Sequence, residues 1–169
     1  MEARTTKKTS RSKGFSQILF HSARNHAIMN AGGIMIEKVN WDDSYLLGIT
    51  DIDEQHKKLL EIANELYAIA TGSPETYKLN MSVALKKLTD YTVYHFSNEE
   101  DYMKNHGYSG VDAHKVAHDN FVKEVNFQIQ HLSSDDVEEG ARFYSYVARW
   151  VMNHIAKADK IWAAAVKNA

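Results

Sequence analysis

Five histidines and two carboxylates stand at spacings that would let their side chains meet around metal ions. Residues four apart on a helix share a face, because four residues turn about 40° beyond a full circle and rise about 6 Å. Imidazole nitrogen and carboxylate oxygen are ligands that suit first-row transition metals. The spacings therefore predict one two-metal site made of seven side chains: His56, His95, Glu99, His114, His118, His154 and Asp159.

Each spacing is weak evidence when it is taken alone. A histidine and an acid at helical spacing more often form an exposed pair, and an isolated histidine such as His56 carries less information still. The prediction depends on their joint occurrence, because the candidates fall on the apolar faces of four helices. Of the successive acids Glu99, Glu100 and Asp101, which lie about 100° apart around a helix, only Glu99 shares the face of His95. Buried charges of this kind need a partner, and a bound cation supplies one.

The last two candidates, His154 and Asp159, are five residues apart. On a regular helix this separation turns the chain by about 140°, too far for both side chains to face one point. The spacing predicts that the regular helix ends or bulges between Ile155 and Ala158.

Apolar periodicity and turn residues indicate the elements that must position these side chains. Helices are predicted at residues 53–71, 75–105, 111–132, and from about 135 to at least 153. Ser73 and Pro74 are typical of a helix start, and Asp135 with Glu138 has the spacing of a capping box. Four amphipathic helices with short connections predict an all-α, antiparallel four-helix bundle with the site in its core.

The other four histidines are predicted to lie at the surface or at element ends. His106 returns to the helical stripe of His95 but would lie about 16 Å further along the axis. His131 falls near the end of the third helix, whereas His21 and His26 belong to a basic N-terminal segment. None of the four is expected to join the site.

Composition limits the class of protein. A chain of 169 residues with 44% hydrophobic and 25% charged residues suits one soluble domain with one core. The absence of cysteine excludes disulfides, thiolate metal sites and iron–sulfur centres. A net charge of -2 gives no indication of nucleic-acid binding, and no apolar run approaches the roughly 20 residues that span a bilayer. We expect a cytoplasmic protein that binds neither nucleic acid nor membrane.

An uneven distribution of charge predicts a boundary after residue 34. Residues 1–34 carry six basic side chains and one acid, and residues 35–169 carry a net charge of -7. The Thr-, Ser-, Lys- and Arg-rich composition predicts a flexible basic extension, with a targeting peptide as the alternative. A second hypothesis places the true start at Met35, because the codons of the preceding Ala31-Gly32-Gly33 can contain a ribosome-binding sequence. The intact mass of the natural protein tests this hypothesis.

The motifs also carry a resemblance to a known family. Asp53-Glu54-Gln55-His56, His95-Phe96-Ser97-Asn98-Glu99-Glu100, His114-x-x-x-His118 and Trp150-Val151-Met152-Asn153-His154-Ile155-x-x-x-Asp159 resemble the hemerythrins, particularly their single-domain bacterial members. The resemblance covers about residues 36–165. It implies an up-down-up-down four-helix bundle that holds a non-haem di-iron centre.

Carried over to this chain, the resemblance implies a role for each of the seven side chains. His114, His118 and His154 would bind one iron, and His56 and His95 the other. Glu99 and Asp159 would bridge the two iron ions together with an oxo or hydroxo group. One coordination position beside His56 and His95 would then stay open for dioxygen. The implied function is reversible dioxygen binding, for storage, delivery or sensing, by a protein that is not an enzyme.

A water-excluding pocket is the further requirement for reversible binding. Phe96, Trp150, Val151 and Ile155 are expected to line it because they are apolar and adjacent to His95 and His154. Two residues depart from the family pattern: Val151 stands where leucine is common, and Trp162 stands where tyrosine or phenylalanine is common.

Other functions stay open on the sequence alone. A di-iron oxidase or peroxidase would need substrate access and turnover. A signalling module would change a contact with a protein partner, which the sequence does not identify, in response to oxygen or iron. Zinc bound by His114 and His118, or a phosphotransfer role for His56, accounts for fewer of the seven residues.

Overall fold

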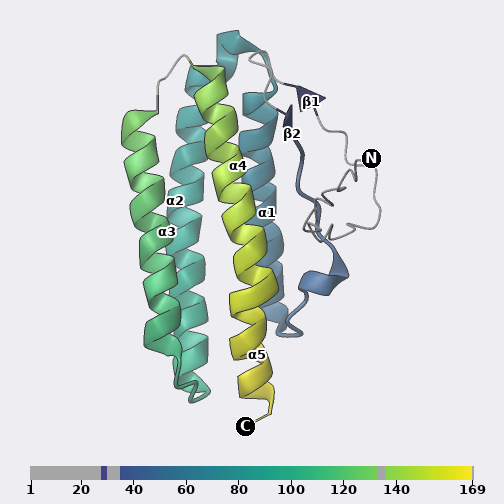
Figure 1. The fold of residues 1–169 in the computed structure, drawn as a ribbon, viewed down its shortest axis with the longest axis vertical. Coiled ribbons are helices and arrows are strands. Elements are labelled where there is room, and N and C mark those ends of the chain that lie inside the picture. Colours follow the sequence, from purple (N-terminus) through teal and green to yellow (C-terminus); the bar gives the residue numbers. More distant parts are fainter. Residues whose placement is uncertain (1–27, 30–34, 133–135, 169) are drawn as a thin grey trace, which may run out of the picture.

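The computed structural model describes residues 28–29, 35–132 and 136–168. Four long helices lie side by side (Figure 1). The helix α1 packs against α2 and α4, and α2 packs against α3. The predicted all-α four-helix bundle is confirmed. Its helices are α1 (Thr50–Ala70), α2 (Pro74–Asn105), α3 (Val111–His131) and α4 (Val137–Asn153), and α4 continues through the π-helical turn η2 (His154–Asp159) into α5 (Lys160–Lys167).

The predicted helix bounds are confirmed to within a few residues, but the fourth helix is capped one residue later than the spacing of Asp135 and Glu138 predicts. The fourth helix is capped by Asp136, whose carboxylate accepts the backbone N–H groups of Glu138 and Glu139 at 2.8 and 3.2 Å. The predicted cap, Asp135, lies outside the described residues. Ser73 occupies the position before α2 as predicted, but its side chain makes no capping hydrogen bond.

The segment before the bundle is tied to it by hydrogen bonds. The hydroxyl of Tyr144 on α4 donates to the carbonyl of Glu37 at 2.5 Å and accepts the backbone N–H of Val39 at 3.2 Å. The amide of Asn64 on α1 donates to the carbonyl of Val39 at 2.8 Å. These contacts attach the chain from residue 37 onward to α1 and α4.

A short antiparallel ribbon precedes these contacts. The strands β1 (Ile28–Met29) and β2 (Met35–Ile36) pair with Ile28 opposite Ile36. The predicted domain boundary after residue 34 falls between the two strands and stays a prediction. The predictions for residues 1–27 and 30–34, including the flexible basic extension, His21 and His26, lie outside the described residues.

A loop at residues 46–49 fixes the start of α1. The buried carboxylate of Asp53 accepts backbone N–H groups from Leu47, Gly48 and Ile49 at 2.7, 2.9 and 3.2 Å. Gly48 has a φ of 72°, a conformation that glycine adopts at little cost. On the other side of the loop, Lys167 of α5 donates to the carbonyl of Leu47. The loop therefore connects the start of α1 to α5 and fixes the residue at which α1 begins.

The buried side chains form two clusters. The larger lies between the four helices and includes Leu66, Leu88 and Phe143. The smaller joins the loop before α1, the end of α2 and α5, and Trp162 is its largest member. Within the described residues, no helix is both long and apolar enough to span a membrane.

Candidate metal centre

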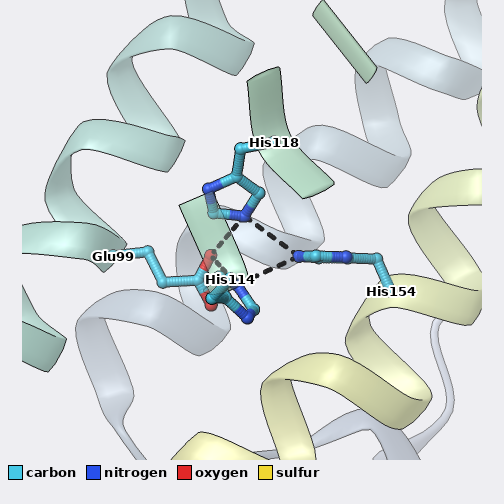
Figure 2. A group of neighbouring side chains, drawn as sticks. All are labelled: Glu99, His114, His118 and His154. Atoms are coloured by element: carbon cyan, nitrogen blue, oxygen red, sulfur yellow. Dashed lines mark hydrogen bonds and ion pairs between the residues drawn. The ribbon is translucent and has the colours of Figure 1, made fainter. Parts of the chain in front are cut away.

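Three histidine rings direct one nitrogen each toward a common point (Figure 2). His114 and His118 lie one turn apart on α3, and His154 begins η2. The Nε2 atom of His154 lies 3.0 Å from Nε2 of His118 and 3.1 Å from Nε2 of His114. Two nitrogen donors at about 2.1 Å from one ion, at right angles to each other, would be about 3.0 Å apart. The three rings therefore have the spacing of donors to a single metal ion.

A second group contains the two remaining histidines of the predicted site. His56 on α1 and His95 on α2 are buried, and their rings meet edge to face with centroids 4.8 Å apart. The Oε2 atom of Glu99 lies 3.8 Å from Nε2 of His95. It also lies 3.3 Å from Nε2 of His118. Glu99 thus belongs to both groups whose donor atoms lie close enough to hold a metal ion.

Asp159 links the two groups through its two carboxylate oxygens. Its Oδ1 atom lies 3.1 Å from Nε2 of His154 and 3.3 Å from Nε2 of His114. Its Oδ2 atom lies 3.3 Å from Nε2 of His56. Because each oxygen faces a different histidine group, this carboxylate can bridge two ions.

The π-helical turn explains how Asp159 reaches this position. In a π-helix the hydrogen bonds run from residue i to i+5, so side chains five residues apart return to one face. The turn η2 spans His154 to Asp159. The predicted interruption of the regular helix is confirmed, and it brings the last two candidates together.

Several buried atoms of the site have no hydrogen-bond partner among the described residues. They are both ring nitrogens of His56, Oε2 of Glu99 and both carboxylate oxygens of Asp159. An unsatisfied buried polar group costs about 1–3 kcal/mol, and a charged one costs more. These atoms approach their neighbours without the alignment of hydrogen bonds. Cations placed between Nε2 of His56 and the carboxylate oxygens would satisfy all of them except Nδ1 of His56, which lies on the other side of its ring. The donor set fits two metal ions.

The two carboxylates are ionised despite their burial. Burial raises the pKa of Glu99, but the close approach of the two histidine rings of α3 outweighs this effect and holds the pKa well below its usual range. Burial and the charge of Glu99 also raise the pKa of Asp159, and contacts with the histidines of η2 and α1 bring it below its ordinary value. Both side chains therefore offer anionic oxygen to a metal.

The charge state of His95 also suits a metal ligand. Burial is the main reason that its pKa falls to about 4, although the charge of Glu99 acts in the opposite direction. The ring is neutral near pH 7, and a neutral ring leaves a nitrogen lone pair for metal coordination.

Two residues that support the histidines were not found from the sequence. Nδ1 of His118 lies 3.1 Å from Oε1 of Glu100. Nδ1 of His95 lies 3.1 Å from Oε1 of Gln55. Partners of this kind orient a metal-binding ring and fix which nitrogen faces the metal. The helical spacing does not place Glu100 among the ligands, and its contact across to α3 leaves no trace in the pattern of α2.

Trp162 is a third supporting residue. Its indole N–H donates to Oε1 of Glu99 at 2.8 Å, and the ring is fully buried. The sequence singled out Trp162 only as a departure from the family pattern. The structure gives this departure a consequence, because phenylalanine at this position could not donate a hydrogen bond.

Two of the four predicted pocket residues stack on rings of the three-histidine group. Phe96 stacks on His118 with ring centroids 3.7 Å apart, and Trp150 stacks on His154 at 4.3 Å. Val151 and Ile155 are buried. These contacts cover part of the rings of His118 and His154 with apolar surface. The role of the four side chains as the lining of an oxygen pocket stays a prediction.

The structure therefore brings all seven predicted donors together, and their individual roles as ligands stay predictions. Of the four histidines predicted to lie at the surface or at element ends, the structure describes two. His106 and His131 are exposed, and each ring contacts the backbone carbonyl four residues before it, at 2.8 and 2.7 Å.

Comparison with known proteins assigns the class of this site. The family described as Hemerythrin HHE cation binding domain matches residues 47–166, which include all seven donors. The chain belongs to the hemerythrin family.

Relatives and a solved structure agree with this assignment. The bacteriohemerythrin of Clostridium acetobutylicum is 35% identical over 71% of this chain and 95% of its own length. A hemerythrin-like protein of Naegleria gruberi is 31% identical over 71% of this chain and 87% of its own length. A crystal structure of wild-type hemerythrin superposes with a TM-score of 0.59 and 27% identity, over 76% of this chain and 97% of that one.

Proposed function

We propose that this chain binds dioxygen reversibly at a non-haem di-iron centre and serves in oxygen storage, delivery or sensing. As a member of the hemerythrin family, it carries two iron ions per chain, which supply the electrons for binding. The observation that carries the proposal is the convergence of three ring nitrogens at 3.0–3.1 Å beside two carboxylates that each face both histidine groups.

The two carboxylates compensate the charge of the metals. Glu99 and Asp159 are fully buried and anionic, and together they offset two of the positive charges that two cations bring into the core. An oxo or hydroxo bridge, as the family resemblance implies, would offset more. The five imidazoles add no charge when they are neutral, so the ligand set is rich in nitrogen and poor in anions. Such a set stabilises high-valent iron less than a carboxylate-rich set, which favours binding of dioxygen over oxidation of a substrate.

The unequal division of histidines provides the place for dioxygen. Three rings would serve one metal position and two would serve the other, and both positions would share the carboxylates that lie close to both histidine groups. The position of His56 and His95 therefore keeps one more coordination site for an external ligand. At the other position, Phe96 and Trp150 stack on the rings of His118 and His154.

We further propose that the chain is not an enzyme and that it acts in the cytoplasm. The charge composition, with no excess of basic residues over the whole chain, supports a protein that works without nucleic acid. The apolar environment of the site supports binding without turnover, because substrate access would admit water as well.

The test combines metal content with optical spectra. Iron-supplied protein should hold two iron ions per chain, and its spectrum should change on exposure to oxygen and return when the oxygen is removed. Sustained consumption of peroxide or an organic substrate, without a reversible adduct, would favour an oxidase or peroxidase instead. Removing both His118 and Glu99 should abolish the spectrum. The matched control is His106→Ala, which removes the exposed histidine at the C-cap of α2, the helix of Glu99, and should leave the iron content unchanged.

A further inference from the structure

Two of the site histidines have outer partners of different charge. Resting on the di-iron function proposed above, we propose that Glu100 is a positioning residue that acts through the ring of His118 to stabilise the oxidised state at the three-histidine position. Gln55 gives His95, at the other position, a neutral partner in the same place.

The orientation of His118 defines which of its nitrogens serves which neighbour. Its Nε2 faces the site, 3.3 Å from Oε2 of Glu99 and 3.0 Å from Nε2 of His154. The proton must then sit on Nδ1, which donates to Oε1 of Glu100 at 3.1 Å because an ionised carboxylate can only accept. Phe96 stacks on the ring with an interplanar angle of 1°, which fixes this orientation.

His95 is arranged in the same way but with a neutral acceptor. Its Nε2 lies on the side of Glu99, and its Nδ1 contacts Oε1 of Gln55 at 3.1 Å. The two contacts have equal length, 3.1 Å, and the two acceptors differ in charge. The chain therefore allows a comparison between a histidine with a charged acceptor, His118, and a histidine with a neutral acceptor, His95.

The charge of Glu100 is only partly compensated by its surroundings. Its residue is 8% exposed, and Nζ of Lys115 lies 3.8 Å from its Oε2. The same ammonium lies 2.6 Å from Oδ1 of Asp119 and is about half exposed, so it is shared and screened by solvent. The contact with His118 faces inward, where screening is weaker.

An anionic acceptor on Nδ1–H makes the opposite nitrogen a stronger donor to a metal. The more highly charged oxidation state gains more from this than the reduced state. Removal of the charge should therefore make the three-histidine position easier to reduce. The expected size of this change is set by analogy with other metal sites, where mutation of such outer partners changes metal affinity or activity about 10- to 100-fold.

The experiment is a potentiometric titration of the iron-loaded full chain, followed by its optical spectrum, together with iron content per chain. Glu100→Gln keeps a hydrogen-bond acceptor of similar shape and removes the charge. We expect it to shift the ratio of reduced to oxidised protein at a fixed potential by at least about tenfold toward the reduced form, which is about 59 mV for one electron. Gln55→Glu makes the opposite exchange at His95 and should shift the ratio toward the oxidised form.

Asp101→Asn is the matched control. Asp101 follows Glu100 on the same helix, carries the same charge, and pairs with Lys104 at the surface at 3.5 Å. Its replacement removes one negative charge without touching a site histidine and should change the potential far less than Glu100→Gln does.

The outcomes separate this inference from the proposed function. If wild-type protein shows no di-iron spectrum, the proposed function fails before any variant is compared. If the spectrum is present and Glu100→Gln keeps both irons with an unchanged potential, Glu100 only orients the ring and the inference is overturned. If Glu100→Gln loses iron, Gln55→Glu decides, because an unchanged or raised potential in that variant overturns the inference as well.

Discussion

The hydrogen bond between Trp162 and Glu99 contributes to the free energy of unfolding by an amount that substitution of Trp162 can measure. The indole is fully buried and donates its N–H to Oε1 of Glu99 at 2.8 Å. A hydrogen bond to a charged group contributes about 1.5–3 kcal/mol to stability. The two indole carbons that a phenyl ring lacks contribute about 1.6 kcal/mol more, at about 0.8 kcal/mol for each buried carbon. We expect Trp162→Phe to lower the free energy of unfolding by about 3–5 kcal/mol.

The assay is urea unfolding of the metal-stripped protein, followed by far-ultraviolet circular dichroism and extrapolated linearly to water. Metal is removed so that iron affinity does not enter the comparison. Trp162→Tyr is the matched variant, because its ring has the same size as that of phenylalanine and carries a hydroxyl donor at its end. It should be more stable than the phenylalanine variant by about 1–2 kcal/mol. Equal stability of the two variants would show that the hydrogen bond contributes nothing, and the reasoning would be wrong.

Three further predictions concern other parts of the site. Asp53→Ala leaves three backbone N–H groups without their acceptor and should destabilise the chain by about 3 kcal/mol or more, measured by the same unfolding assay. A loss below about 1 kcal/mol would contradict the role of Asp53 in fixing the loop before α1. The pKa of His95 is about 4 in the folded metal-free chain and 6.5 ordinarily, so the folded state binds fewer protons between these values and stability falls as the pH is lowered from 6.5 to 4. This loss, about 3 kcal/mol, should be absent from His95→Gln when unfolding is compared at the two pH values. Val151→Leu should fill the apolar wall and slow the rate at which the oxygen-loaded protein loses its capacity to bind oxygen, and an unchanged rate would refute a role for Val151 in water exclusion.

The helices and the donor pairs could be predicted because they depend on local periodicity. His114 and His118 lie four residues apart, so a single helix determines that they share a face. The five-residue interval before Asp159 was informative for the opposite reason, since it conflicts with a regular helix and so predicts the π-helical turn.

The supporting contacts could not be predicted because they depend on neighbouring helices. Glu100 lies off the stripe of His95 and becomes buried only because α3 packs beside it. Gln55 reaches His95 from α1, and Trp162 reaches Glu99 across 63 positions of sequence. The prediction of the N-cap of α4 fails for a different reason. Two successive acids precede α4 and are equally good candidates, and the backbone conformation selects Asp136. The strands β1 and β2 have two residues each, too few to show an alternating pattern.

Asp159 and Glu99 each lie close to both histidine groups, and in the proposed di-iron site this has a consequence for how the metals are lost. A carboxylate that swings away weakens the hold on both ions together, so the departure of one ion should promote the departure of its neighbour. A chelator would then strip the protein in a single kinetic phase, and half-loaded molecules would be scarce at every stage.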